Sequence, residues 1–353
     1  MAEVVLENAV KDFGGTRAVD DVSLTVGDGE FFTLLGPSGC GKTTTLRLVA
    51  GLEYADSGRV LIGGRDVTRV PPAGRRIAMV FQNYALYPHM TIRENIGYPL
   101  KLKKKPEREL NEKVDEVARR LGIEQVLARS PAAISGGQQQ RAAVARAMVG
   151  EPLVYLFDEP LSNLDARLRL ESRRFLKHVL RETGGTAVYV THDQTEAMAL
   201  SDRVAVMKEG RLIQVAAPEE LYARPASTFV AGFVGHLPMN LIEGEVRMAD
   251  GPAFCAGDLR VKLPAGTAGR DGARATLGAR PEDLALTMGG GIRGRVEDVE
   301  ELGSEKIVTV SCRGVALIVR VVVGQAPRPG DEADVIFDPA RVHLFDEKGE
   351  RID

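Results

Sequence analysis

The residues between positions 36 and 44 have the composition and order of a phosphate-binding loop. A strand-like apolar run at residues 31–35 leads into this segment, and a helix is predicted over residues 42–50. Glycines let consecutive backbone N–H groups turn inward around phosphate oxygens, and the helix adds the positive end of its dipole. A chance glycine-rich turn is the alternative, which the flanking strand and helix disfavour. The residues expected to contact Mg-ATP are Gly36, Pro37, Ser38, Gly39, Cys40, Gly41, Lys42, Thr43 and Thr44.

Within that loop, two side chains have definite chemistry. Lys42 would reach the β- and γ-phosphates, and the Thr43 hydroxyl would ligate magnesium. Two adjacent carboxylates, Asp158 and Glu159, follow a second predicted strand at residues 153–157. Beside a phosphate site, Asp158 would hold the magnesium through water, and Glu159 would polarise the attacking water as a general base. A strand end with solvated acids is the alternative.

A serine and two glycines precede another predicted helix, which runs to about Val149. Ser135 is a suitable N-cap, and the glycines leave backbone amides open, so the helix start forms a second anion-binding surface. Alone, this pattern would indicate an ordinary capped helix. Because a phosphate loop lies elsewhere in the chain, we expect a phosphate to be contacted by Ser135, Gly136, Gly137 and Gln138.

Three single residues complete the candidate site. His192 follows a predicted strand and could sense the γ-phosphate, although a histidine there is more often structural. Gln82 follows the apolar run at residues 77–81 and could reach magnesium and water, although a lone glutamine is usually a surface residue. Phe13 could stack on adenine, and a core aromatic is the alternative.

The elements that would position these residues alternate between strand and helix over the first two-thirds of the chain. This alternation is typical of an α/β fold with a mostly parallel sheet. Helices are predicted at 107–121 and 166–183, a buried strand at 186–191, and a hairpin at 203–215 that turns at 208–210.

The bulk composition is that of a globular protein with two or three domains. The chain has 353 residues, of which 44% are hydrophobic, and a net charge of -3 gives no basic field for nucleic acid. Cys40, Cys255 and Cys312 are scattered, which fits free thiols in a reducing cytosol. No apolar run has membrane-spanning length. If the protein acts at a membrane, we therefore expect it to bind there through a partner protein.

The character of the chain changes near Gly235. Short β-rich runs follow, including residues 306–310 and 315–323, and no long amphipathic helix is predicted. We therefore expect a first domain at 1–235, with a helical subdomain at about 84–150, and a separate all-β barrel at 236–353.

Taken in order, these features resemble the ABC-transporter ATPases. The resemblance rests on the P-loop, the Q-loop Gln82, the signature Ser135–Gln139, Asp158 and Glu159, and the switch His192, together with a D-loop at 162–165. It implies an ABC nucleotide-binding domain with a RecA-like core and a helical subdomain. It also implies that Asp165 of the D-loop contributes to nucleotide binding.

Longer stretches narrow the resemblance to importers of carbohydrates, of the maltose and sn-glycerol-3-phosphate types. They are residues 81–96, 158–169 and 191–203, and in the tail 229–246, 277–284 and 299–305. The tail is similar to the OB-like, TOBE-type accessory barrel of that branch. Ile134 stands where the signature usually has leucine, Phe13 replaces tyrosine or tryptophan, and His236-Leu237 replaces the usual Ser-Pro.

The resemblance also implies an assembly. Two copies would close head to tail over two ATP molecules, each held by Lys42 of one copy and the signature of the other. Residues 84–91 would meet two integral-membrane permease subunits, and an extracytoplasmic solute-binding protein would act indirectly. The dimer would sit peripherally at the cytoplasmic face of the inner membrane, and a cytosolic regulator could act on the tail.

Other functions remain open from the sequence. Polyamine, iron(III) and sulfate importers have similar motors with similar barrels, and residues 238–240 favour carbohydrate over these. A soluble ABC protein of DNA repair or translation would usually have two cassettes or a long coiled coil. A P-loop kinase or GTPase is not expected to contain the Ser-Gly-Gly-Gln motif at residues 135–138.

Overall fold

The computed structural model describes residues 2–249, 251–265, 271–322 and 327–352. The chain divides into two compact units, Met1–Pro218 and Glu219–Asp353. The two units meet at residues 218 and 219, before the domain boundary predicted between residues 235 and 236. The predicted domain boundary stays a prediction.

The first unit has two sheets. A six-stranded sheet has the order β10-β9-β3-β8-β7-β6, in which all neighbours run parallel except the hairpin β9–β10. Its strands are β3 (Phe31–Leu35), β6 (Ile77–Val80), β7 (Val154–Asp158), β8 (Thr186–Thr191), β9 (Arg203–Lys208) and β10 (Arg211–Ala216). A four-stranded antiparallel sheet has the order β2-β1-β4-β5 and consists of β1 (Val4–Phe13), β2 (Thr16–Val26), β4 (Ser57–Ile62) and β5 (Arg65–Asp66).

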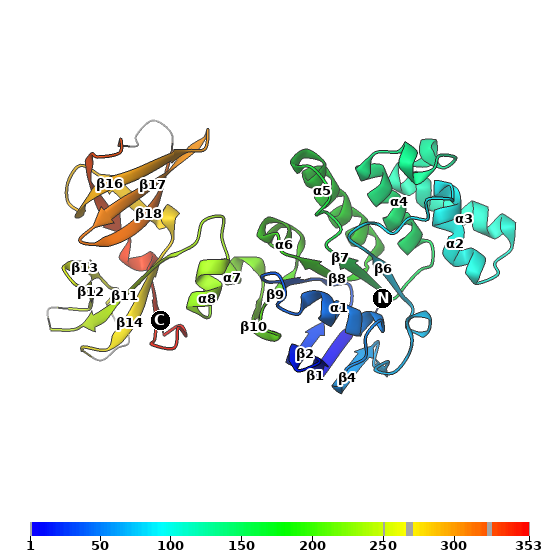
Figure 1. Cartoon of the computed structure of the whole chain (residues 1–353), viewed down its shortest axis with the longest axis horizontal. Coiled ribbons are helices and arrows are strands. Elements are labelled where there is room, and N and C mark those ends of the chain that lie inside the picture. Colours follow the sequence, from blue (N-terminus) through cyan, green and yellow to red (C-terminus); the bar gives the residue numbers. More distant parts are fainter. Residues whose placement is uncertain (1, 250, 266–270, 323–326, 353) are drawn as a thin grey trace. The chain divides into compact units, whose positions relative to one another are not determined.

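Helix α1 (Lys42–Ala50) contacts strands of both sheets, and its apolar residues share one core with them (Figure 1). The second core of this unit lies among the remaining helices and the six-stranded sheet. These helices are α2 (Ile92–Leu102), α3 (Glu107–Leu121), α4 (Gly136–Met148), α5 (Ala166–Thr183) and α6 (Gln194–Leu200). The predicted helices at 42–50, 107–121 and 166–183 and the strands at 31–35 and 186–191 are thereby confirmed.

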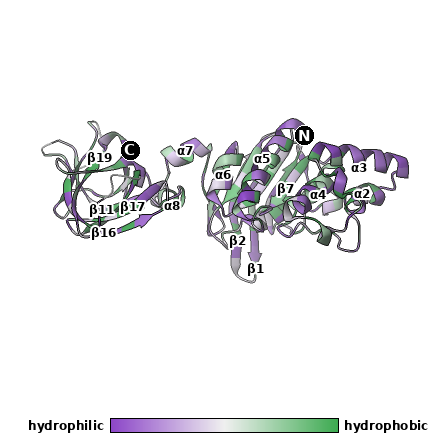
Figure 2. Ribbon diagram, turned by 90° about the horizontal axis from the view of Figure 1, so that it is seen from above, coloured by the Kyte–Doolittle hydropathy of each residue, from purple (hydrophilic) through white to green (hydrophobic). Residues whose placement is uncertain are grey.

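Helix α3 illustrates why the apolar spacing was informative. Much of the helix is hydrophilic (Figure 2), whereas Val114, Val117, Ala118 and Leu121 are buried. These four residues recur at helical spacing, so one stripe of α3 packs on α2 and α4 while the rest faces water. The helix ends at Gly122, as predicted.

The second unit is all-β apart from short helices, as the sequence predicted. It has two five-stranded antiparallel sheets, β13-β12-β11-β14-β20 and β15-β19-β16-β17-β18, whose inward residues form one core. The first contains β11 (Asn240–Arg247), β12 (Ala253–Ala256), β13 (Leu259–Lys262), β14 (Arg274–Ala279) and β20 (His343–Phe345). The second contains β15 (Leu284–Thr287), β16 (Ile292–Glu301), β17 (Glu305–Cys312), β18 (Val315–Val322) and β19 (Glu332–Phe337). Val323, the last residue of the predicted strand at 315–323, lies outside the described residues.

Two short helices, α7 (Pro218–Ala223) and α8 (Thr228–Phe233), precede the strands of this unit. Arg280, which follows β14, is buried and anchors the helical segment. It donates hydrogen bonds to Val234 O at 2.6 Å and to Tyr222 O at 2.8 Å, and its guanidinium lies 3.9 Å from the centroid of the Tyr222 ring. The segment that contains α7 and α8 is therefore fastened to the β-structure that follows it.

Asn240 joins the two sheets of the second unit. Its amide donates to Ala279 O at 3.1 Å and Ile318 O at 2.9 Å, and its carbonyl accepts from Ile318 N at 2.7 Å. Asn240→Ala should therefore leave buried backbone groups unpaired and lower the free energy of unfolding by about 1–3 kcal/mol. Chemical denaturation of the full chain measures this, with the exposed Glu243→Ala on the same strand as the control. Equal stability of the two variants would contradict the role of Asn240.

Candidate nucleotide-binding site

The loop at residues 36–41 has a shape that only glycine permits at two positions. Gly41 has a φ of 104°, and a Cβ there would lie 2.1 Å from Ala18 O. A Cβ on Gly36 would lie 2.4 Å from Met207 O. Gly39 also has a positive φ, but the space beside it is open. Backbone atoms of the neighbouring strands thus pack against both ends of the loop, at Gly36 and Gly41, and leave open space beside Gly39 in its middle.

A hairpin that the sequence did not connect with the site supports this loop. Gly210, in the turn between β9 and β10, donates to Cys40 O at 3.0 Å and accepts from Asp20 N at 2.9 Å. Arg17 and Arg211 both pair with Asp20, which lowers the pKa of that carboxyl, chiefly through the Arg211 hydrogen bond. The hairpin was predicted from its turn, but its contact with residue 40 joins positions far apart in the chain.

Lys42 points back into the loop. Its side chain is buried, and Nζ donates to Gly36 O and Pro37 O, both at 2.8 Å, and lies 3.7 Å from Cys40 Sγ. Since the carbonyls satisfy two of its three donors, the ammonium is held at the centre of the loop. A positive charge enclosed by backbone there suits the phosphates of a nucleotide, and the contact of Lys42 with those phosphates stays a prediction.

Two of the predicted magnesium ligands, Thr43 at the start of α1 and Asp158 at the end of β7, lie together. Thr43 Oγ1 donates to Asp158 Oδ1 at 3.2 Å. Burial raises the pKa of Asp158, and the hydrogen bond from Thr43 opposes this shift. The donors are a hydroxyl and one carboxylate, which fits Mg²⁺ because that ion takes few protein oxygens and completes its shell with water and substrate phosphate.

Glu159 and His192 are brought into contact from neighbouring strands. Glu159 Oε2 lies 2.9 Å from His192 Nδ1. Glu159 itself is in the left-handed region at φ 46°, and its N–H donates to Val190 O at 3.0 Å. The sequence placed both side chains at strand ends. Their contact follows from the parallel pairing of β7 with β8, whose carboxyl ends meet at one edge.

A buried acid near His192, Glu196, was not predicted from the sequence. Glu196 on α6 accepts from Tyr189 Oη at 2.7 Å and from Thr191 Oγ1 at 2.8 Å. Burial raises the pKa of Glu196 above its usual value. The only signal was a glutamate one helical turn beyond His192. These bonds fix the end of β8 from which His192 projects.

The segment after Glu159 reaches the Q-loop. Asn163 Nδ2 donates to Gln82 O at 2.9 Å, and Ser162 Oγ donates to Glu159 O at 2.9 Å. Asp165 caps α5, because its Oδ1 accepts from Leu168 N at 2.9 Å. The capping bond gives Asp165 a structural role, and its contact with nucleotide stays a prediction.

The signature residues form a capping box at the start of α4. Ser135 Oγ accepts from Gln138 N at 3.4 Å, and the Gln138 side chain accepts from Ser135 N at 3.1 Å. Within the described part of the chain, their hydrogen bonds stay in this helix end and none reaches residues 36–44. Among the described residues, no hydrogen bond therefore links the two predicted anion-binding surfaces of one copy.

Phe13 ends β1 with 47% of its surface exposed. Lys11 Nζ lies 5.2 Å from its ring centroid, which is a cation–π contact. The core alternative for Phe13 is wrong, and its stacking on adenine stays a prediction.

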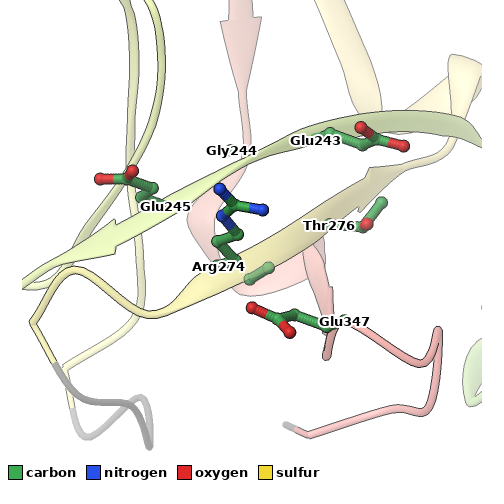
Figure 3. A pocket seen from close by; sticks show the side chains of 7 residues that line it. Glu243, Gly244, Glu245, Arg274, Thr276 and Glu347 are labelled. Carbon is green, nitrogen blue, oxygen red and sulfur yellow. The ribbon is translucent and has the colours of Figure 1, made fainter.

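Two hollows lie apart from these residues. One, of about 860 Å³, is in the first unit and we call it the Tyr87 groove. It is lined mainly by apolar and aromatic side chains, among them Leu52, Phe81, Tyr87, Tyr98 and Leu102. The other, of about 520 Å³, lies in the second unit beside Glu243, Glu245, Arg274 and Glu347 (Figure 3). It contains none of the predicted site residues.

Three family models match the chain. They are an ABC transporter model at residues 19–162, a MalK OB fold domain at 238–284 and a TOBE domain at 277–345. The TOBE and OB matches agree with the predicted class of the tail. No helix among the described residues combines the length and the apolar character needed to cross a membrane.

Several characterised proteins are similar over nearly the whole chain. The trehalose/maltose import ATP-binding protein MalK of Thermococcus litoralis is 48% identical, with 98% of each chain covered. The sulfoquinovosyl glycerol transport ATP-binding protein SmoE of Agrobacterium fabrum is 45% identical, with 99% of each covered. The sn-glycerol-3-phosphate import ATP-binding protein UgpC of Chromobacterium violaceum is 44% identical, with 99% of this chain and 96% of that protein covered.

Solved structures match part of the chain. A dimeric post-hydrolysis state of the ATP-binding cassette MJ0796 with ADP and Pi is 31% identical, with a TM-score of 0.55. The match covers 61% of this chain and 98% of the MJ0796 chain. The structure of cbiO1 from Clostridium perfringens, part of the ABC transporter complex cbiONQ, is 29% identical, with a TM-score of 0.59, and covers 63% and 90%.

The fold and the loop geometry define a P-loop nucleotide-binding protein with an all-β tail. The chain belongs to the ABC transporter family. Within this family it is an import ATP-binding subunit, an ATPase coupled to transport.

Proposed function

We propose that the chain hydrolyses Mg-ATP as a homodimer and energises the import of a sugar, polyol or glycerol-phosphate derivative. The observation that carries the proposal is the meeting of Thr43 with Asp158 and of Glu159 with His192 at one edge of the six-stranded sheet. A phosphate loop, a pair of magnesium ligands and a base with its histidine partner are thereby next to one another.

Each side chain has a separate task in this proposal. Lys42 stabilises charge on the β- and γ-phosphates. Thr43, Gln82 and, through water, Asp158 would hold Mg²⁺, which would neutralise phosphate charge. Glu159 accepts the proton of the attacking water. His192 fixes Glu159 through Nδ1 and can contact the γ-phosphate by its other nitrogen. Gln82 orients the water, and Phe13 stacks on the adenine.

Dimerisation is favoured because the signature end of α4 has exposed donors, and no hydrogen bond among the described residues links them to the phosphate loop of the same copy. Ser135 is exposed, and Gly136 and Gly137 are partly so. A second copy would supply the loop and its ATP, so that each nucleotide is held by Lys42 of one copy and by Ser135, Gly137 and Gln138 of the other. Loss of the γ-phosphate removes a ligand of both copies and opens the pair.

The Tyr87 groove suits a helix of a permease subunit. It is apolar over much of its lining and includes Arg76, Lys103 and Arg146. Such a helix would present apolar residues to Tyr87 and Tyr98 and acidic or carbonyl groups to the cations. The chain would then work at the cytoplasmic face of the membrane beside two permeases, with a solute-binding protein outside and a regulator acting on the tail.

The names of the relatives support the solute class. Their printed solutes are trehalose or maltose, sulfoquinovosyl glycerol and sn-glycerol-3-phosphate, all polyhydroxylated. Reconstituted with its co-purifying permeases and binding protein, the chain should show a severalfold rise in ATP hydrolysis with a solute of this class. The same complex with Glu159→Gln is the control. Stimulation by sulfate, iron(III) or a polyamine, but not by carbohydrates, would contradict the proposal.

A further inference from the structure

The turn that follows Gln82 has an unusual backbone. Tyr84 and Ala85 are adjacent and both lie in the left-handed region, with φ values of 62° and 48°. Residues with a Cβ rarely adopt this conformation, and two in succession persist only where the surroundings hold them. Tyr84 N donates to Phe81 O at 2.9 Å, which closes the turn at its start.

Arg146 holds the carbonyls of this strained pair. From α4, its Nη1 donates to Ala85 O at 2.7 Å and its Nη2 donates to Tyr84 O at 2.8 Å. The guanidinium also lies 5.6 Å from the Tyr87 ring centroid. The guanidinium of Arg146 is partly buried, and this burial lowers its pKa. The two carbonyls therefore replace water as partners of the charge. A planar fork with two parallel donors fits the pair in a way that lysine cannot reproduce.

Other side chains hold the two ends of the same segment. Asn163 donates to Gln82 O at the beginning. At the end, the buried Asn95 accepts from Tyr87 N at 2.8 Å and donates to Thr91 O at 3.0 Å. The arginine therefore fixes the middle, where the backbone is least favourable.

We propose that Arg146 is a positioning residue for hydrolysis, which acts by holding the Tyr84–Ala85 turn so that Gln82 is presented to the nucleotide. Gln82 follows β6, whose Val80 pairs with Phe157 immediately before Asp158. A released turn would let Gln82 move relative to the carboxylates without disturbing the phosphate loop. This inference rests on the proposed role of Gln82 in hydrolysis.

The test is Arg146→Lys, with Arg141→Lys as a matched control. Arg141 is on the same helix, donates to Leu121 O at 3.0 Å and lies 4.7 Å from the Phe175 ring centroid, and these contacts lie outside the turn. In Arg146→Lys, amide hydrogen exchange of residues 83–87 should become at least about tenfold faster. The kcat for ATP hydrolysis should fall about 10–100-fold, with the Kd for ATP within about twofold of wild type. Arg141→Lys should change neither.

A second variant checks the strain itself. Ala85→Gly, added to Arg146→Lys, should restore part of kcat, because glycine occupies the left-handed region without the penalty. The proposal is overturned by unchanged exchange at the turn, by unchanged kcat, by ATP affinity and kcat falling together, or by no recovery with Ala85→Gly. A failure of the proposed role of Gln82 would look different, since exchange at the turn would still rise in Arg146→Lys while Gln82→Ala retained wild-type kcat.

Discussion

Glu159→Gln is expected to lower ATP turnover by about 10²–10⁴-fold, because the amide cannot accept the proton of the attacking water. The Kd for ATP should stay close to that of wild type, since Lys42 and the glycine loop are untouched. The substitution keeps the shape of the side chain and leaves an atom within reach of His192 Nδ1, which lies 2.9 Å from Glu159 Oε2. Phosphate release at saturating Mg-ATP measures the turnover.

Glu209→Gln is the matched control. Glu209 is also a glutamate with a positive φ, 49° against 46° for Glu159, but it is exposed in the β9–β10 turn. A loss caused only by exchanging a glutamate in a left-handed conformation would appear in both variants. Wild-type turnover in Glu159→Gln would remove this residue as the base.

Lys42→Ala is expected to weaken ATP binding by about 10–100-fold. The estimate corresponds to the loss of charge-assisted hydrogen bonds worth roughly 1.5–3 kcal/mol, with about 1.4 kcal/mol for each factor of ten. Without the ammonium, the carbonyls of Gly36 and Pro37 lose their partner and repel the phosphates. Titration calorimetry with ATP measures the affinity.

Lys105→Ala serves as the control for this variant, because Lys105 is an exposed lysine that pairs with Glu109 on the helical surface. Its ATP affinity should match that of wild type. If Lys42→Ala bound ATP as tightly as Lys105→Ala does, the loop at residues 36–44 would not be the nucleotide site.

The sequence predicted the parts of the site that depend on neighbours along the chain. The glycine and lysine spacing, the strand before it and the helix after it are local, so the loop and its lysine could be assigned directly. The N-cap at Ser135 is local in the same way, and the structure adds the reciprocal bond of Gln138, which lies within one helical turn of it.

What the sequence left open depends on pairing between distant segments. The contact of Glu159 with His192 requires β7 and β8 to be neighbours, and the support of Cys40 by Gly210 requires a hairpin from the far end of the unit to reach the loop. Arg146 was one of two arginines on a predicted helix, and only the fold brings it to the carbonyls of Tyr84 and Ala85.

The tail shows the same limit. Alternating β-rich runs predicted an all-β unit, but they carry no information on which strands meet. The pairing of Leu277 with Leu344 adds β20, the last strand of the unit, to the edge of one sheet. Asn240 joins this sheet to the other one through Ile318. Residues 238–240 favoured carbohydrate importers, and Asn240 at the end of this stretch also connects the two sheets of the tail.

Sedimentation of the Glu159→Gln chain with nucleotide is the most direct test of a γ-phosphate bound between two copies. With saturating Mg-ATP the chain should sediment as a dimer, and replacing ATP by Mg-ADP should return it to the state observed without nucleotide. A chain that remains monomeric at saturating Mg-ATP would contradict this account.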